Sequence, residues 1–220
     1  AWFPGGKDSW YITQYLVEGM GHLDHLGVNK TLSGVQSIEK MDAVVAKAVS
    51  YIDSKIIERY NKLEEYVKKN DKIKLEDNHL SHMDIHFLYA RSFYKNLPMT
   101  KEAQKVHDYF LGQAKTYWTN RSVYNRGLIA LALYRNDETT TSNLIIEGFR
   151  QSAQNDEEKG MYWNYNAGYY WYEMPIESHA LMIEVFSEAA NDAKAVEDLK
   201  LWLLKNKQTN HWKTTKATAA

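Results

Sequence analysis

Three histidines in one short segment have a spacing that could hold a metal ion. His79, His82 and His86 stand at positions i, i+3 and i+7, so a helix through this segment would place all three imidazoles on one face. Three imidazoles at this spacing can bind zinc and leave the fourth position to water. The alternative is that they are polar groups at a helix start and along a partly hydrated face. We predict no metal, and we keep these three as the candidate ligands.

Aromatic side chains are concentrated between residues 156 and 175. Aromatics that carry a polar group are common anchors of protein interfaces, and they also form platforms for sugars. A third alternative is a loop that packs on itself over the rim of the fold. For an interface with another domain, the candidates are Trp163, Tyr165, Tyr169 and Trp171.

A few acidic and histidine side chains raise the alternative of a carbohydrate-active enzyme. Glycosidases and polysaccharide lyases need a carboxylate acid and base, or a set of Asn, His and Tyr side chains. The candidates here are Asp84, Glu173, Glu177 and His179. Their spacing gives no support for a common site, and positions at helix caps or at the rim explain them better. We therefore predict that the chain is not an enzyme.

The overall composition excludes several classes of function. The 220 residues include 27 Lys and Arg against 28 Asp and Glu, for a formal net charge of −1. This balance argues against a general nucleic-acid binder and removes bulk attraction to anionic membranes. No apolar run approaches the roughly 18 residues of a membrane span, so we expect no direct membrane insertion by this segment. Cys is absent, which excludes disulfides, thiolate metal sites and a cysteine nucleophile, and we expect no cofactor.

The elements that must position these residues are helices. The 11 Gly and 3 Pro are too few for an all-β chain rich in turns, and Leu, Ala, Lys and Glu are abundant. Asp8 or Ser9 can cap the first helix, Thr100, Ser122 and Asp192 are suitable N-caps of later ones, and we expect the first helix to stop at Gly27. In the first helix, Ile12, Tyr15, Leu16, Gly19, Leu23 and Leu26 follow at helical spacing. The expected helices cover about residues 9–26, 40–69, 79–94, 100–118, 122–134, 141–153, 175–190 and 192–204, and a ninth begins near 215.

The apolar width of these helices alternates along the chain. The third, fifth and seventh are apolar almost all round, as in the run 128–133, so they must be buried on most sides. The second, fourth, sixth and eighth have one apolar face and one solvated face. Inner helices that alternate with outer helices indicate two concentric shells. We therefore predict an all-α chain that forms a single α/α toroid domain of helical hairpins over residues 1–220. A plain solenoid is the competing architecture.

Several segments resemble bacterial α2-macroglobulin-like proteins, in the toroidal thioester-type domain that they share in outline with complement proteins. The N-terminal match is Trp2-Phe3-Pro4-Gly5-Gly6 followed by residues 10–19 (WYITQYLVEG). A second match is residues 175–184 (PIESHALMIE). The third and most specific is residues 196–209 (VEDLKLWLLKNKQT), which lead into 212–218 (WKTTKAT). Together the matches extend over nearly the whole chain.

The resemblance implies a role in protease inhibition. In this family a bait region is cleaved, the molecule changes shape and the protease is trapped. Some members also capture the protease through a thioester in a Cys-Xaa-Glu-Gln motif. This sequence has no Cys, so it cannot form the thioester. The expected partners are other domains of a longer parent chain and, through that parent, target proteases. The resemblance also implies a periplasmic or cell-surface location, and the start and end of the sequence suggest a partial ring cut from a longer chain.

Overall fold

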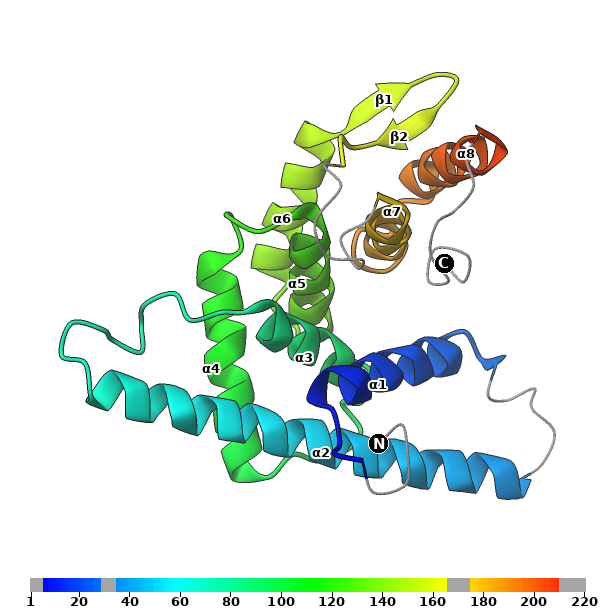
Figure 1. Cartoon of the computed structure of the whole chain (residues 1–220). Helices are drawn as coiled ribbons and strands as arrows, with labels where there is room; N and C mark the ends of the chain where they lie inside the picture. Colours follow the sequence, from blue (N-terminus) through cyan, green and yellow to red (C-terminus); the bar gives the residue numbers. More distant parts are fainter. Residues whose placement is uncertain (1–5, 29–34, 166–174, 210–220) are drawn as a thin grey trace. The chain divides into compact units, whose positions relative to one another are not determined.

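The computed structural model describes residues 6–28, 35–165 and 175–209 (Figure 1). In this part of the chain eight α-helices and one short β-hairpin are present, which confirms the predicted all-α class. The elements are α1 (Trp10–His25), α2 (Val35–Lys68), α3 (His82–Ser92), α4 (Lys101–Tyr117), α5 (Val123–Arg135), α6 (Thr139–Ser152), β1 (Gln154–Asp156), β2 (Gly160–Tyr162), α7 (Pro175–Glu184) and α8 (Ala193–Thr209). Among the described helices, none is both long enough and apolar enough to cross a membrane.

Local hydrogen bonds explain where most helices begin. The side chains of Ser9, Thr100 and Ser122 accept from the backbone N–H three residues later, at 3.4, 3.1 and 3.3 Å. Asp192 does the same for α8, at 3.0 Å. Each bond satisfies a backbone donor that the first helical turn leaves without a partner. Of the two candidates for α1, Ser9 is the cap, and the other three predicted N-caps are confirmed. Gly27 follows α1 with φ +71°, the left-handed conformation that favours glycine after a helix.

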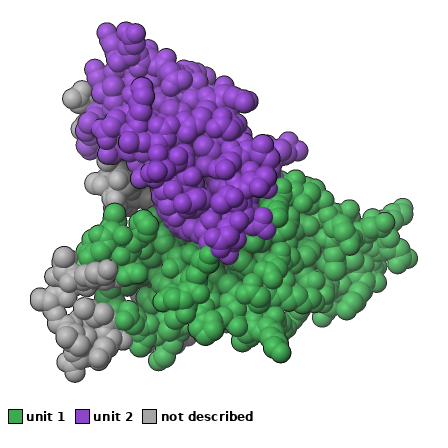
Figure 2. Space-filling view, turned by 180° about the vertical axis from the view of Figure 1, so that it is seen from behind, with its two compact units in different colours: residues 1–117 green, residues 118–220 purple. Residues whose placement is uncertain are grey.

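The chain divides into two compact units, residues 1–117 and 118–220 (Figure 2). Unit 1 contains α1 to α4, and unit 2 contains α5 to α8 with the hairpin. Each unit has its own buried helices and is described by itself. The single toroid domain over 1–220 stays a prediction.

In unit 1, α1 and α3 lie side by side and run parallel. Residue numbers increase in the same direction along both helices: Gln14 contacts Met83, Glu18 contacts His86 and His22 contacts Tyr89. α3 is buried along its whole length from Asp84 to Ser92, as its apolar width predicts. α2 packs against α1, α3 and α4 and has a charged outer face. α3 is therefore the central helix of this unit.

In unit 2, α5 and α7 form a second parallel pair. Gly127 lies against Leu181 and Met182, and two turns later Arg135 binds Glu184. α5 is buried from Gly127 to Leu133 without interruption, which confirms the predicted all-round burial. α6 packs on α5 and keeps one solvated face. Each unit thus contains two neighbouring parallel helices that are separated in sequence by one other helix.

Some details of the elements differ from the expectations, and one lies outside the described residues. The segment after α6 begins with the hairpin β1–β2, where a loop was expected, and Gly160 in it has φ +77°. α7 ends at Glu184 and continues as a π-helical segment, Val185–Ala189, whereas one helix to about 190 was predicted. Residues near 215, the predicted start of a ninth helix, lie outside the described part.

The largest surprise is α1, because its buried face is partly polar. Its buried residues are Gln14, Val17, Glu18 and Gly21. The leucines of its regular apolar spacing face outward instead: Leu16, Leu23 and Leu26 are 58%, 38% and 73% exposed.

Candidate functional site

The sequence-predicted residues that the structure brings together lie in unit 2, around His179. Trp163 and Tyr165 follow β2, His179 is on α7, and Trp202 is on α8. The His179 ring centroid lies 4.2 Å from that of Trp202, 5.9 Å from Tyr165 and 6.4 Å from Trp163. We call these four residues the aromatic–histidine cluster. Trp202 was not among the predicted candidates, because nothing local relates α8 to the segment after β2.

Hydrogen bonds define the state of the His179 ring. Its Nε2 lies 2.8 Å from the backbone carbonyl oxygen of Leu199, which can only accept, so Nε2 carries the proton. Nδ1 of the neutral ring then accepts from the Tyr165 hydroxyl, at 2.9 Å. Burial lowers the pKa of His179 to about 4, although the bond to Leu199 acts in the opposite direction. Burial also raises the pKa of Tyr165. Both ring nitrogens of His179 are therefore engaged in structural bonds at neutral pH.

The position of Trp163 requires a correction of its predicted role. Its side chain is only 4% exposed, its Nε1–H donates to the Phe149 carbonyl at 3.1 Å, and its ring contacts Phe149 and Phe186. Trp163 therefore packs inside unit 2 and offers little surface to another domain. Tyr165 is partly exposed, and its interface role stays a prediction. Tyr169 and Trp171 lie outside the described residues.

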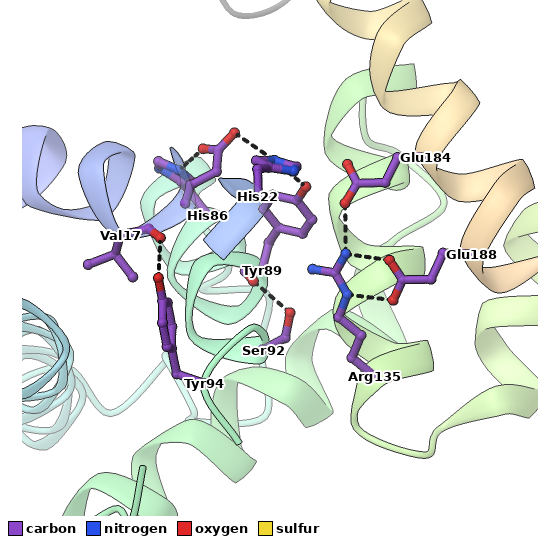
Figure 3. Close-up of polar contacts among 10 residues, drawn as sticks. Val17, His22, His86, Tyr89, Ser92, Tyr94, Arg135, Glu184 and Glu188 are labelled. Atoms are coloured by element: carbon purple, nitrogen blue, oxygen red, sulfur yellow. Dashed lines mark hydrogen bonds and ion pairs between the residues drawn. The ribbon is translucent and has the colours of Figure 1, made fainter. Parts of the chain in front are cut away.

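A second group of functional side chains lies between α1 and α3 in unit 1 (Figure 3). His86 Nε2–H donates to the Glu18 carboxylate at 2.7 Å, and both side chains are buried. The other Glu18 oxygen lies 3.8 Å from His22 Nε2, which is 3.1 Å from the Tyr89 hydroxyl. We call Glu18, His22, His86 and Tyr89 the α1–α3 polar network. It joins two parallel helices by charge-assisted hydrogen bonds, which are stronger than neutral ones.

The same helix shows why the three-histidine prediction is wrong in its geometry. α3 begins only at His82, because Ser81 caps it through a reciprocal bond pair with Asp84. His79 lies before the helix, and its Nε2 is 2.7 Å from the Lys74 carbonyl oxygen. The pattern Ser81-x-x-Asp84 is the sequence signal that marks the observed start of α3. Within the described ranges no group of three His, Cys, Asp or Glu side chains could hold a metal ion.

The side chains considered for an enzyme belong to different units. Asp84, in unit 1, accepts from the Ser81 N–H at 2.8 Å and is fully buried as a helix cap. Glu177, in unit 2, is buried in the first turn of α7, where a carboxylate interacts favourably with the helix dipole. His179 belongs to the aromatic–histidine cluster, and Glu173 lies outside the described residues. The two described carboxylates thus occupy positions at helix N-termini, as expected.

A third polar group, also drawn in Figure 3, stabilises the end of α5. The Arg135 guanidinium binds the Glu188 carboxylate through two bonds, at 2.7 and 2.6 Å, and Glu184 at 2.7 Å. Glu188 lies in the π-helical segment, so this two-bond contact ties the irregular turn to α5.

Comparison of the chain with protein-family models, with curated proteins and with solved structures finds no match. The functional inference therefore depends on the residues, their contacts and the resemblance of the sequence segments described above.

Proposed function

We propose that this chain is a non-catalytic α/α-toroid domain of a bacterial α2-macroglobulin-like protease inhibitor. In the intact inhibitor, the domain docks against its neighbours and takes part in the shape change that follows cleavage of the bait region. The proposed location is the periplasm or the cell surface. The sequence contains no Cys, so capture by this segment is mechanical and involves no thioester.

One observation carries the proposal beyond the sequence resemblance. In each unit, helices two apart in the chain run parallel, α1 with α3 and α5 with α7, and α3 and α5 are buried along most of their length. More exposed helices alternate with them. Successive αα-hairpins with the same orientation produce this arrangement, because the first helices of neighbouring hairpins then run in the same direction. It is the arrangement that a toroid requires, and it supports the toroid for the whole chain.

The chemistry of the described side chains supports a structural role. Two of the side chains considered for catalysis are buried and engaged in hydrogen bonds: His179 with Leu199 and Tyr165, and Asp84 with Ser81. A catalytic acid or base must reach a substrate proton at hydrogen-bonding distance. These contacts favour an inhibitor domain over a carbohydrate-active enzyme.

A protease-caging assay with the intact parent inhibitor tests the proposal. Trypsin is mixed with the parent, and cleavage of a small peptide substrate and of a large protein substrate is followed in parallel. A caged protease keeps its activity on the small substrate and loses it on the large one. The matched control is the 220-residue chain alone, which should change neither activity.

Two results would overturn the proposal. Equal activity on both substrates in the presence of the parent would show that trypsin is not trapped. Turnover of any member of a polysaccharide panel by the 220-residue chain would favour the enzyme alternative. In that case variants of Glu177 would be the first to examine.

A further inference from the structure

Arg126 on α5 carries a charge that no described residue balances. Its side chain is half-buried, and its Nε–H is buried without a hydrogen-bond acceptor. No carboxylate or carbonyl in the described part of the chain binds the rest of the guanidinium. Burial lowers the pKa of Arg126, and no neighbouring charge opposes this effect. A guanidinium has several N–H donors, so the bonding capacity of this one is unused within the described residues.

Other arginines of the chain show what Arg126 lacks. A carboxylate lies against the guanidinium of each of Arg59, Arg91, Arg135 and Arg150. Arg150 is the best comparison, because it lies over the ring of Phe186 as Arg126 lies over that of Phe149. The guanidinium carbons are 5.1 and 5.2 Å from the two ring centroids. Two carboxylates complete the Arg150 contact, whereas Arg126 has the ring without a carboxylate from the described residues.

The surrounding sequence does not compensate the charge. Residues 109–136 contain no Asp or Glu, and the first turn of α5 has no acidic side chain. Arg126 is the fourth residue of α5, so the positive end of the helix dipole adds to its charge. A partly desolvated charge without a partner is unfavourable, and a neutral side chain of similar length would cover Phe149 without this cost. A bound anion therefore explains why an arginine stands here.

Phe149 fixes how the guanidinium is presented. The Phe149 ring is fully buried, and Trp163 holds the same turn of α6 by donating to the Phe149 carbonyl at 3.1 Å. Contact with the face of an aromatic ring restricts the orientation of the guanidinium plane. A planar carboxylate can then accept two parallel N–H bonds from one guanidinium. The contact is thus prepared for a ligand of this shape and charge.

We infer that Arg126, held over Phe149, is a binding site for a carboxylate ligand. Arg150 supports this choice, because in the same setting its guanidinium binds two carboxylates. The site lies between α5 and α6 within unit 2, and it does not depend on the proposed function.

NMR spectroscopy of the 220-residue chain labelled with ¹⁵N-arginine tests the inference. The Arg126 Nε–H signal is identified by its absence from Arg126→Lys, and the Arg150 signal, which serves as the matched control, by its absence from Arg150→Lys. The probes are N-acetyl-glutamate amide, its uncharged counterpart N-acetyl-glutamine amide, and inorganic phosphate. Sodium chloride keeps the ionic strength constant.

We expect the glutamate probe to shift the Arg126 signal saturably and the glutamine probe to leave it unchanged. The Arg150 signal should not move, because its guanidinium already has partners. The glutamate probe should also raise the melting temperature of the wild type and of Arg150→Lys. Arg126→Lys keeps the charge but loses the planar fork, so its affinity for the probe should fall at least tenfold.

The stability of the unliganded chain gives an independent readout. Arg126→Met should melt within about 3 °C of the wild type or above it, because it removes a charge without breaking an ion pair. Arg150→Met should melt lower than Arg126→Met, because it breaks the contacts with both carboxylates. An equal decrease for the two Met variants would show that Arg126 has a structural role, which would overturn the inference.

Three NMR results would also overturn it. One is no shift of the Arg126 signal by the glutamate probe, and another is an equal shift of the Arg126 and Arg150 signals, which would indicate a general effect of charge. The third is a larger shift with phosphate than with the glutamate probe, which would assign the site to another class of anion. Glu173 lies outside the described residues. A shift of the Arg126 signal in Glu173→Gln without any probe would show that the chain's own carboxylate occupies the guanidinium, and the inference would fail.

Discussion

Acidification should destabilise unit 2 through one residue, His179. The neutral ring is fully buried between the Tyr165 hydroxyl and the Leu199 carbonyl. Burial lowers its pKa to about 4 in the folded chain, whereas an unfolded histidine titrates near 6.5. Between these values the unfolded state binds more protons than the folded state. The contribution of His179 to the free energy of unfolding is therefore fully present above about pH 6.5. It is lost as the pH falls toward 4.

The expected size of the loss follows from this pKa difference. Proton linkage predicts that the free energy of unfolding falls by about 2.5 kcal/mol between pH 7 and pH 4.5. The variant His179→Gln removes the titrating group and keeps a donor for Leu199 and an acceptor for Tyr165. It should be less stable than the wild type at pH 7 and should lose much less stability on acidification.

Urea denaturation over a series of pH values measures the effect. Trp163 and Trp202 lie within 6.4 and 4.2 Å of the His179 ring, between ring centroids, so tryptophan fluorescence reports unfolding near the site. The quantity compared is the difference in unfolding free energy between variant and wild type at each pH. Titration of other groups, including His107 in unit 1, largely cancels in this difference. If the two proteins lose equal stability to within about 0.5 kcal/mol, the reasoning is wrong.

Three further substitutions test the packing of the two units by urea denaturation at pH 7. Gly160→Ala should destabilise by more than about 2 kcal/mol, because its Cβ would lie 2.0 Å from the Asp198 carbonyl oxygen at φ +77°. Gly148→Ala, in open space on α6, is its control and should stabilise by up to about 1 kcal/mol; equal effects would contradict the clash. Arg91→Met should lower the free energy of unfolding by about 3 kcal/mol, because it removes the buried ion-pair partner of Asp53 on α2. Glu18→Ala should cost about 2 kcal/mol by removing the acceptor of the His86 hydrogen bond. A loss below 1 kcal/mol for either of these last two would show that the contact it removes contributes little to stability.

The α1–α3 polar network changes how the surface of unit 1 is understood. Glu18 and Gln14 are buried on α1, where the Glu18 carboxylate accepts from His86 and the Gln14 amide N–H donates to the Met83 carbonyl on α3. Because this face of α1 packs against α3, the leucines on the opposite face lie outside the core of the unit. The network and the exposed leucines of α1 are therefore two consequences of one packing arrangement.

The helical class, most helix starts and the burial of α3 and α5 could all be predicted from the amino-acid sequence. N-caps depend on atoms three residues apart, so Ser9 and Ser122 act within one turn wherever the helix packs. All-round burial follows from composition, because a run such as 128–133 has no polar side to expose. The start of α3 was missed by three residues only because the Ser81–Asp84 capping pattern was not used.

Tertiary structure decided the rest. Periodicity shows that the α1 leucines share a face but not which of two faces points inward, because that depends on partners 69 residues away in sequence. The aromatic–histidine cluster likewise needs α8 beside α7, so that the Leu199 carbonyl and the Trp202 ring enclose His179. A side chain gains stability from burial only when a second element packs against it, so a single segment does not show which of its faces will be buried. Local sequence therefore predicts the helices and their caps. The contacts that decide which face of a helix is buried form only when the helices pack together.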